Sequence, residues 1–270
     1  MSIKLAIVLG SSILFAPAAF PQISGFTLES KGNMVLVNFT TPRGSPAPAV
    51  TGAPYSADQV WEQVKTLADG TRVSEDPSVR HVLRDSQGRT RTGRPLYSIR
   101  DPKTAISVVE IRDPVDGFYY ILDEQNKIAH RFATGKAPPM PEVTRSPDPP
   151  PGQAAPSKPA SDGTHPHNSI EKLGSQWIEG VMAEGQRSTT TWPAGTQGND
   201  RPIVSVYEAW VSPDLHLEVR SKTLDPRNGE TTIRLTNLSR ADPDPGLLQP
   251  PQDYAIVDEK GPFTMSVTRN

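Results

Sequence analysis

The stretch LDPRNGETTIRL, residues 224 to 235, holds four charged residues that could do chemistry: Asp225, Arg227, Glu230 and Arg234. The Asp-Pro-x-x-Gly spacing inside it recurs at Asp113 to Gly117. In that spacing the proline presets φ near about −65°, the aspartate accepts hydrogen bonds from the turn, and the glycine takes a positive φ. We therefore interpret the charged cluster as a turn between neighbouring strands rather than as a reactive site.

The first candidates for metal ligation are histidines, since the chain contains no cysteine. His165 and His167 stand two residues apart in a His-Pro-His stretch, but a metal site needs three or four fixed ligands. The remaining histidines lie alone in separate segments: His81, His130 and His216. The sequence thus predicts no metal site and no cofactor.

No nucleophile or phosphate-binding motif can be found either. The chain lacks a Gly-x-Ser-x-Gly elbow, a Walker loop and a Gly-x-Gly-x-x-Gly fingerprint. Arginines at positions 84, 89, 91 and 94 could bind an acidic group on one sheet face, although charged residues on the wet face of an antiparallel sheet are the commoner explanation. Paired carboxylates from distant strands leave a hydrolase open as a lesser alternative. No catalytic residue is predicted.

Apolar residues that alternate along expected strands offer the better functional candidate. If they are covered they form the core, and if the sheet is open they form a pocket for an acyl chain or a hydrophobic peptide. The candidate ligand-binding residues are Phe118, Tyr120, Leu122, Trp210, Leu215, Leu217 and Val219.

The elements that must position these residues are mostly strands, because the hydrophobic period is two. In LHLEVRSKT the apolar residues at positions 215, 217 and 219 share one face, and polar residues occupy the other. Turn signals recur at short spacing, at 86–88, 113–117, 124–126, 212–214 and 225–229. Short connections join neighbouring strands, so the sequence predicts an antiparallel meander.

Residues 57–68 can be read in two ways. Ser56 and Gln59 form a capping box, and Val60, Val64 and Leu67 have helical spacing, which favours a helix. The following Asp69-Gly70 pair is also a strong hairpin signal.

The composition divides the chain into segments. The N-terminus has one lysine, a short apolar run and small residues, which is typical of a cleaved signal peptide; we expect no membrane span after cleavage. Net charge is −2, with no excess that would indicate nucleic-acid binding. The 29 prolines concentrate in two stretches. We expect a signal peptide (1–22), a flexible segment (23–54), a first half-sheet (55–134), a proline-rich disordered linker (135–167) and a second half-sheet (168–263).

Several stretches, among them LADGTRVSE, DPVDGFYYILDEQNK and LGSQWIEGVMAEGQR, resemble an uncharacterised family of exported acidobacterial proteins. More remotely, the part from EAWVSPDL to DYAIV is similar to the LolA-type periplasmic half-barrel. The long linker and the lack of an obvious long helix depart from that pattern. The resemblance favours a strand over a helix at 57–68.

The alternation, the composition and the resemblance together predict a mainly β protein with a curved antiparallel sheet of the half-barrel type, little helix and a long proline-rich insertion. The signal peptide predicts export to the periplasm or secretion, and the resemblance implies a non-enzymatic binding protein whose partner is a lipid, an acyl chain or a lipoprotein segment held on a concave apolar face. An envelope protein-interaction or sensor module with a fully packed core is the alternative. The oligomeric state is not predicted.

Overall fold

The computed structural model describes residues 26–31, 33–40, 48–67, 69–74, 76–95, 107–138 and 165–268. The predicted signal peptide and residues 139–164 of the predicted linker lie outside these ranges. Within the described ranges, the structure consists of strands and one short 3-10 helix, η2 (Pro245–Leu248). No helix in this part of the chain is long and apolar enough to cross a membrane.

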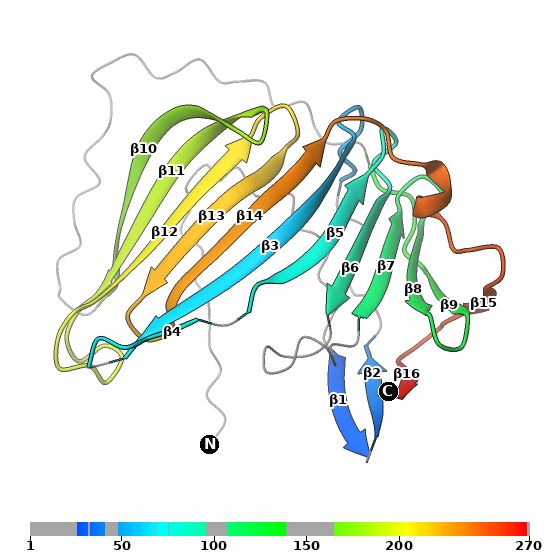
Figure 1. The fold of residues 1–270 in the computed structure, drawn as a ribbon, viewed down its shortest axis with the longest axis horizontal. Helices are drawn as coiled ribbons and strands as arrows, with labels where there is room; N and C mark the ends of the chain where they lie inside the picture. Colours follow the sequence, from blue (N-terminus) through cyan, green and yellow to red (C-terminus); the bar gives the residue numbers. More distant parts are fainter. Residues whose placement is uncertain are drawn as a thin grey trace.

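Two sheets are formed (Figure 1). The small sheet has three strands in the order β1-β2-β16. Its strands are β1 (Phe26–Lys31), β2 (Met34–Phe39) and β16 (Phe263–Thr268). The large sheet has thirteen strands in the order β10-β11-β12-β13-β14-β3-β5-β6-β7-β8-β9-β15, with β4 paired to β3.

The large sheet is built from two meanders. The first comprises β3 (Tyr55–Thr66), β4 (Arg72–Ser74), β5 (Ser78–Arg84), β6 (Thr90–Pro95), β7 (Ser107–Asp113), β8 (Phe118–Asp123) and β9 (Ile128–Ala133). The second comprises β10 (His167–Ile178), β11 (Val181–Trp192), β12 (Ile203–Ser212), β13 (Leu217–Asp225) and β14 (Gly229–Ser239). Strand β15 (Ala255–Asp258) completes the edge beside β9.

The two halves of the sequence join into one sheet through β14 and β3, which pair antiparallel from Glu230↔Val64 to Ser239↔Ser56. This pairing confirms the predicted mainly β, antiparallel architecture with little helix. It also settles the segment at 57–68, because Tyr55–Thr66 is a strand. Its hairpin turns at Gly70, whose φ is 85°, and β4 follows. Long-range pairing on both edges of β3 has overridden a local helical signal.

The part of the sheet from β7 to β9 is packed on both faces. One face meets the small sheet in a core that contains Val35, Phe39, Ile121 and Phe132, among others. The other face is covered by the segment that contains η2 and Tyr254: Leu248 is fully buried, and Tyr254 packs against the cluster that includes Ile111 and Leu122. Three layers therefore protect these strands.

The small sheet corrects one sequence expectation. Residues 23–54 were expected to be flexible, yet 26–31 and 34–39 are strands. Val35, Val37 and Phe39 are completely buried, and β2 pairs with the C-terminal strand β16. The period-two pattern of MVLVNF supplies the apolar face, and its partner strand is more than 200 residues away in sequence.

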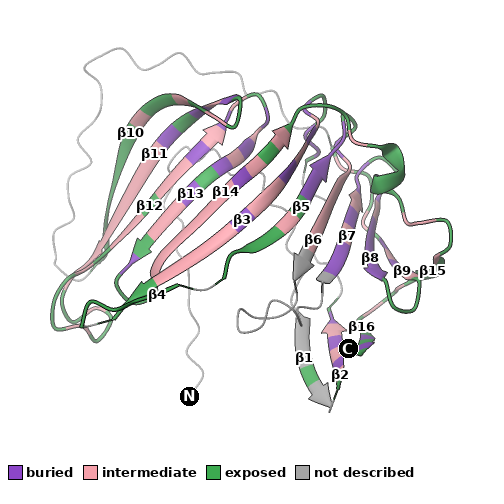
Figure 2. Ribbon diagram, viewed as in Figure 1, coloured by how far each residue is buried: buried purple, intermediate pink, exposed green. Residues whose placement is uncertain are grey.

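The half from β10 to β14 is far less covered (Figure 2). Strand β10 has no buried residue, and β14 has one, Leu235. Burial is concentrated at one end of these strands, where Leu215, Val219 and Ala183 join a core cluster with Tyr55 and Val82. The remaining length of the strands keeps both faces accessible.

Candidate ligand-binding face

The accessible strands carry an uncharged surface on one side, which we call the neutral face. Cross-strand partners share a face of a sheet, so the pairing register defines it. The first row runs across six strands through Ile170, Ser188, Tyr207, Thr223, Thr231 and Gln63. The second row runs through Gln186, Ala209, Ser221, Ile233 and Trp61. Apolar and aromatic groups alternate here with small polar ones.

The side chains of the neutral face are partly open to solvent. Ile170 and Tyr207 are 47% and 40% exposed, and Trp61 and Ile233 are half-buried. Lys172 stands at the outer edge of the second row, on β10. Large apolar groups that stay accessible in the middle of a sheet offer a surface on which an apolar ligand could lose its contact with water.

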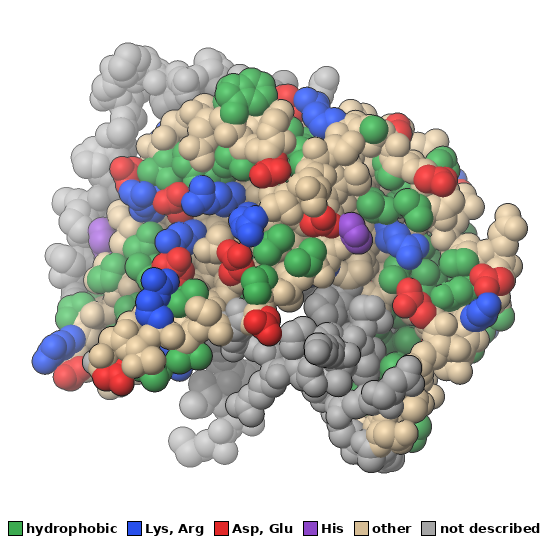
Figure 3. Space-filling view, in the orientation of Figure 1, with side chains coloured by type: hydrophobic (Ala, Val, Ile, Leu, Met, Phe, Trp, Pro, Cys, Tyr) green, Lys and Arg blue, Asp and Glu red, His purple; other side chains and the backbone are tan. Residues whose placement is uncertain are grey.

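The opposite side, which we call the charged face, holds the row of ionic side chains between the two neutral rows (Figure 3). Arg187 contacts Glu171 and Glu208, each at 3.0 Å. Two further ion pairs join Lys222 to Glu230 at 2.9 Å and Arg234 to Glu62 at 3.2 Å. The Glu208 carboxylate also accepts a hydrogen bond from Trp210, which with Arg187 lowers its pKa. One sheet thus separates a solvated ionic side from an uncharged side.

The sheet curls toward the neutral face at one end. Arg84 pairs with Tyr55, which lies on the same side of β3 as Trp61. The Arg84 guanidinium donates to the carbonyl oxygens of Ala53 and Leu215. Leu215 precedes β13, three strand spacings from β5, which would be about 14 Å in a flat sheet. An arginine side chain cannot span that distance, so this end of the sheet must bend.

Burial makes this end rigid. Tyr55 is 1% exposed, and loss of hydration raises the pKa of its hydroxyl to about 12. The Arg84 guanidinium lies over the Tyr55 ring at 4.9 Å from its centroid, and desolvation lowers the pKa of Arg84. The cation, its two carbonyl acceptors and the ring fix the curvature beside the open strands.

Asp225 stands at the far end of the neutral face and is neutralised there. Its carboxylate accepts from the Arg227 backbone, from Ser205 Oγ at 3.0 Å and from Arg227 Nη2 at 2.7 Å. The hydrogen bonds from Arg227 hold the pKa of Asp225 well below its usual range. Arg227 also lies over Trp192, 5.9 Å from the ring centroid. The charge of Asp225 is thus paired at this end of the neutral face.

Tyr207 places an aromatic hydroxyl in the first row of the neutral face. It donates a hydrogen bond to Glu218 Oε2, and burial together with this carboxylate raises the pKa of Tyr207. The phenol stays protonated at neutral pH, so it presents an uncharged ring to the surface.

The turns that hold the hairpins confirm the interpretation of the opening cluster. Asp225 and Asp113 both accept turn amides, and Gly229 and Gly117 take φ values of 91° and 79°. Two further aspartates do the same at Asp85 and Asp123. The charged group at residues 225–234 is therefore structural.

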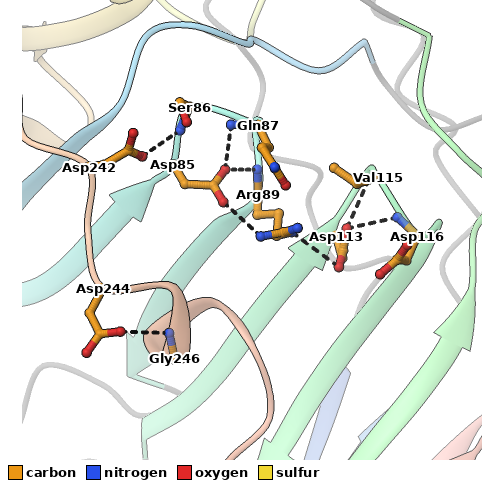
Figure 4. A network of polar contacts seen from close by, with 10 residues as sticks. All are labelled: Asp85, Ser86, Gln87, Arg89, Asp113, Val115, Asp116, Asp242, Asp244 and Gly246. Atoms are coloured by element: carbon orange, nitrogen blue, oxygen red, sulfur yellow. Dashed lines mark hydrogen bonds and ion pairs between the residues drawn. The ribbon is translucent and has the colours of Figure 1, made fainter.

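Arg89 ties two of these turns together (Figure 4). It contacts the Asp85 carboxylate at 3.2 Å and that of Asp113 at 3.5 Å, and all three side chains are buried or nearly so. Asp242, on the segment that leads to η2, accepts from the backbone N–H of Ser86 at 2.8 Å. The network locks the covering segment onto the loops of the covered half.

The residues predicted from the sequence fall into two separate clusters. Phe118, Tyr120 and Leu122 lie beside Tyr254 under the covering segment. The other four predicted residues, Trp210, Leu215, Leu217 and Val219, join the cluster at the curled end. All but Phe118 are at most 8% exposed, so the structure does not gather the seven into one open surface. That they contact a ligand stays a prediction.

The sequence reasoning missed the neutral face. Its residues alternate with charged ones on β11, β12, β14 and β3, which is a period-two signal. That signal is present in TTIRLTN and in SVYEAWV. The stricter apolar alternation in β13 and β8 instead supplied most of the predicted ligand-binding residues. Because the local pattern of residues 57–68 also fits a helix, it did not indicate that Trp61 lies on a sheet face.

Within the described part of the chain, no group of three or more His, Asp or Glu side chains could hold a metal ion. His81 lies 2.6 Å from Asp58, and His130 lies 2.8 Å from Glu259. His216 occupies a turn with a φ of 47°. Each of these three histidines lies in a different part of the fold.

No family model and no curated protein matches the chain, so the acidobacterial resemblance stays a prediction. Solved structures give distant matches. A chain of the Pseudomonas aeruginosa MucA/MucB complex has 16% identity and a TM-score of 0.36, covering 76% of this chain and 58% of that one. A LolA superfamily protein from Nitrosomonas europaea has 9% identity and a TM-score of 0.29, covering 73% and 90%. LprF from Mycobacterium bovis has 14% identity and a TM-score of 0.28, covering 72% and 90%. This chain thus spans less than two thirds of the matched MucA/MucB chain.

Proposed function

We propose that the protein is an exported, non-enzymatic binding protein that holds an acyl chain or a similar apolar segment against the neutral face. The observation that carries the proposal is the uncharged double row of Ile170, Tyr207, Ile233 and Trp61 on a sheet whose other side is ionic. A ligand with a charged surface would find better partners on the charged face.

Burial of apolar surface supplies the driving force. Each Å² removed from water contributes about 25 cal/mol, so covering about 200 Å² gives roughly 5 kcal/mol before the cost of ordering the ligand. Serine, threonine and glutamine between the apolar groups tolerate contact with an ester or amide of the ligand. The curled end, fixed by Arg84, sets one boundary of the surface.

Binding of a fluorescent fatty acid tests the proposal. Ile233→Glu places a carboxylate in the middle of the neutral face, and we expect affinity to fall by about tenfold or more. Thr232→Glu adds the same charge one residue away on the charged face and is the matched control. Equal binding by the two variants, or no binding by the wild type, would exclude the neutral face as the site.

Native mass spectrometry of protein taken from the envelope gives an independent measurement. We expect a bound acyl mass on a mature chain that lacks the predicted signal peptide. A clean apo mass, together with an intact N-terminus in the cytosolic fraction, would contradict both the ligand and the export route.

A further inference from the structure

Strand β15 is attached to the large sheet differently from every other strand that the structure describes. It runs parallel to β9, whereas all other strand pairs in the described residues are antiparallel. All four of its residues are exposed, with Ile256 at 51% and Val257 at 40%. The strand is thus held with little apolar burial.

Contacts between basic and acidic side chains hold β15 in place instead. Three basic side chains at β9 meet three acidic side chains of the segment that contains β15. Lys127 contacts Asp253 at 2.6 Å, and His130 contacts Glu259 at 2.8 Å. Arg131 binds both oxygens of a third carboxylate, Asp258, at 2.6 and 2.9 Å. Main-chain bonds from Ala255 to Lys127 and from Glu259 to Arg131 complete the contact.

Two of the basic side chains, Arg131 and His130, are also held by contacts with aromatic rings outside β15. The Arg131 guanidinium lies over the Phe118 ring at 4.6 Å from its centroid. His130 stacks on Phe263 with ring centroids 4.0 Å apart, on the other face of β9. The edge therefore presents a preorganised guanidinium on one face and an oriented imidazole on the other, with the main-chain groups that β15 contacts between them.

Lys127 adds a third basic group to this edge, from the β8–β9 turn. It adopts a φ of 52°, at the position that Gly117 and Gly229 take in two other turns and that His216, with a φ of 47°, takes in a third. A side chain costs free energy in that region of backbone space, and glycine does not. The lysine supplies an ammonium group that glycine could not.

The hold on β15 is weak and local. Parallel pairs over four residues are less stable than antiparallel ones, and exposed ion pairs contribute little. The flanking chain is anchored independently, by Leu248 before β15 and by Met265 and Val267 after it, all of them buried. Residues 255–259 can therefore dissociate from β9 while the rest of the fold stays in place.

We propose that the β9 edge is a docking site for an extended acidic segment of a partner protein, and that β15 occupies this site within the chain. The partner would add a strand through main-chain hydrogen bonds. Its carboxylates would replace those of Asp253, Asp258 and Glu259 on Lys127, Arg131 and His130. The site is separate from the neutral face and does not depend on the ligand proposed there.

A synthetic peptide of residues 251–262 tests the site in trans on the full-length protein. One variant, which we call the strap variant, carries Asp253→Asn, Asp258→Asn and Glu259→Gln. These substitutions weaken the contact of the chain's own strand β15 with β9, which competes with the peptide. A matched control variant neutralises three acids on the charged face instead, by Glu62→Gln, Glu171→Gln and Glu208→Gln. Affinity is measured by fluorescence anisotropy of the labelled peptide at low salt.

We expect the peptide to bind the strap variant roughly eightfold more tightly than it binds the wild type or the control, since the loss of each of the three side-chain contacts should weaken the internal strand by a factor of about two. A peptide with the same three acids neutralised should lose this gain. Equal affinity for all three proteins, or full binding of the neutral peptide, would overturn the proposal.

Hydrogen exchange of the unmodified protein provides a second measurement that does not require a variant to fold. High salt should accelerate exchange at residues 255–259 by about fivefold or more, because it screens the three pairs. Exchange in β8, which is buried on both faces, should stay unchanged. Residues 255–259 that exchange as slowly as β8 in high salt would rule out a releasable strand.

Discussion

Strands β8 and β10 belong to the same sheet, but they differ in how far their residues are buried. Strand β8 buries five of its six residues, because the small sheet covers one face and the segment around η2 covers the other. Strand β10 is twelve residues long and buries none. A sheet needs at least one buried face to be stable, so the covered half supplies the stability that lets the other half keep its surface free.

Isoleucines in the two halves give the largest expected contrast. Ile121 is fully buried between Tyr119 and Phe132, whereas Ile170 is 47% exposed. Ile121→Ala should lower the free energy of unfolding by about 3 to 4 kcal/mol, and Ile170→Ala by less than about 1 kcal/mol. Urea denaturation followed by tryptophan fluorescence measures both. Similar losses for the two variants would mean that the open half is packed as tightly as the covered half.

Arginines sharpen the same contrast. Arg89 is 15% exposed and lies between two buried carboxylates, so Arg89→Met leaves Asp85 and Asp113 without their cation. We expect a loss of about 2 to 3 kcal/mol. Arg187→Met removes an exposed pair network on the charged face and should cost less than about 1 kcal/mol. A larger effect at Arg187 would place essential stability in the open half.

Strand β3 shows why one part of the architecture could be predicted and another could not. The alternation and turns of the sequence were sufficient for the meanders and for the aspartate turns at Asp113 and Asp225. Local spacing at Val60 and Val64 indicated a helix. Such spacing carries no information about the two strands, β14 and β5, that pair with β3 in the fold. The prediction of a strand came from a resemblance, and the pairing confirms it.

The candidate site was harder to predict for a related reason. A continuous run such as FYYIL in β8 is buried on both faces, so its apolar residues mark the core. The accessible aromatic residues Trp61 and Tyr207 each stand between a valine and a glutamate in sequence, so neither belongs to a strict apolar alternation. They become one surface only after three pairings, β12 with β13, β13 with β14 and β14 with β3, bring their strands together. The register of those pairings is not visible in any single strand.

Glycines test the turns of the two halves. At Gly117 a Cβ would lie 2.7 Å from the backbone carbon of Gly135, and φ is 79°. At Gly180 in the β10–β11 turn φ is similar, 76°, but no atom lies within 4 Å. Gly117→Ala should therefore cost about 2 to 3 kcal/mol, and Gly180→Ala about 1 kcal/mol, from strain alone. Thermal denaturation distinguishes them; equal shifts would mean that close packing adds nothing at Gly117.

Acid titration probes the anchor of the open half at Asp225. Its pKa is lowered in the folded state, so its contribution is present above the unfolded pKa of about 4 and is lost as pH falls below that value. Asp225→Asn should cost about 1 kcal/mol at pH 6, since Arg227 is partly exposed, and the difference from wild type should shrink toward pH 2. Glu171→Gln, on an exposed pair, is the control. A difference that grows with acidity would reverse the sign of the argument.

Lys127 gives the smallest expected effect and the closest test of the covered half at its edge. Lys127→Gly removes the strain of a positive φ but adds unfolded-state entropy and breaks the exposed pair with Asp253, so the net change should stay within about 0.5 kcal/mol. In an Asp253→Asn background the pair is already absent, and the same substitution should then be more favourable by the energy of that pair. A double-mutant cycle from urea denaturation measures this coupling. Zero coupling would mean that the lysine has no compensating contact for its strained backbone, and Lys127 would then add no binding group to the edge of β9.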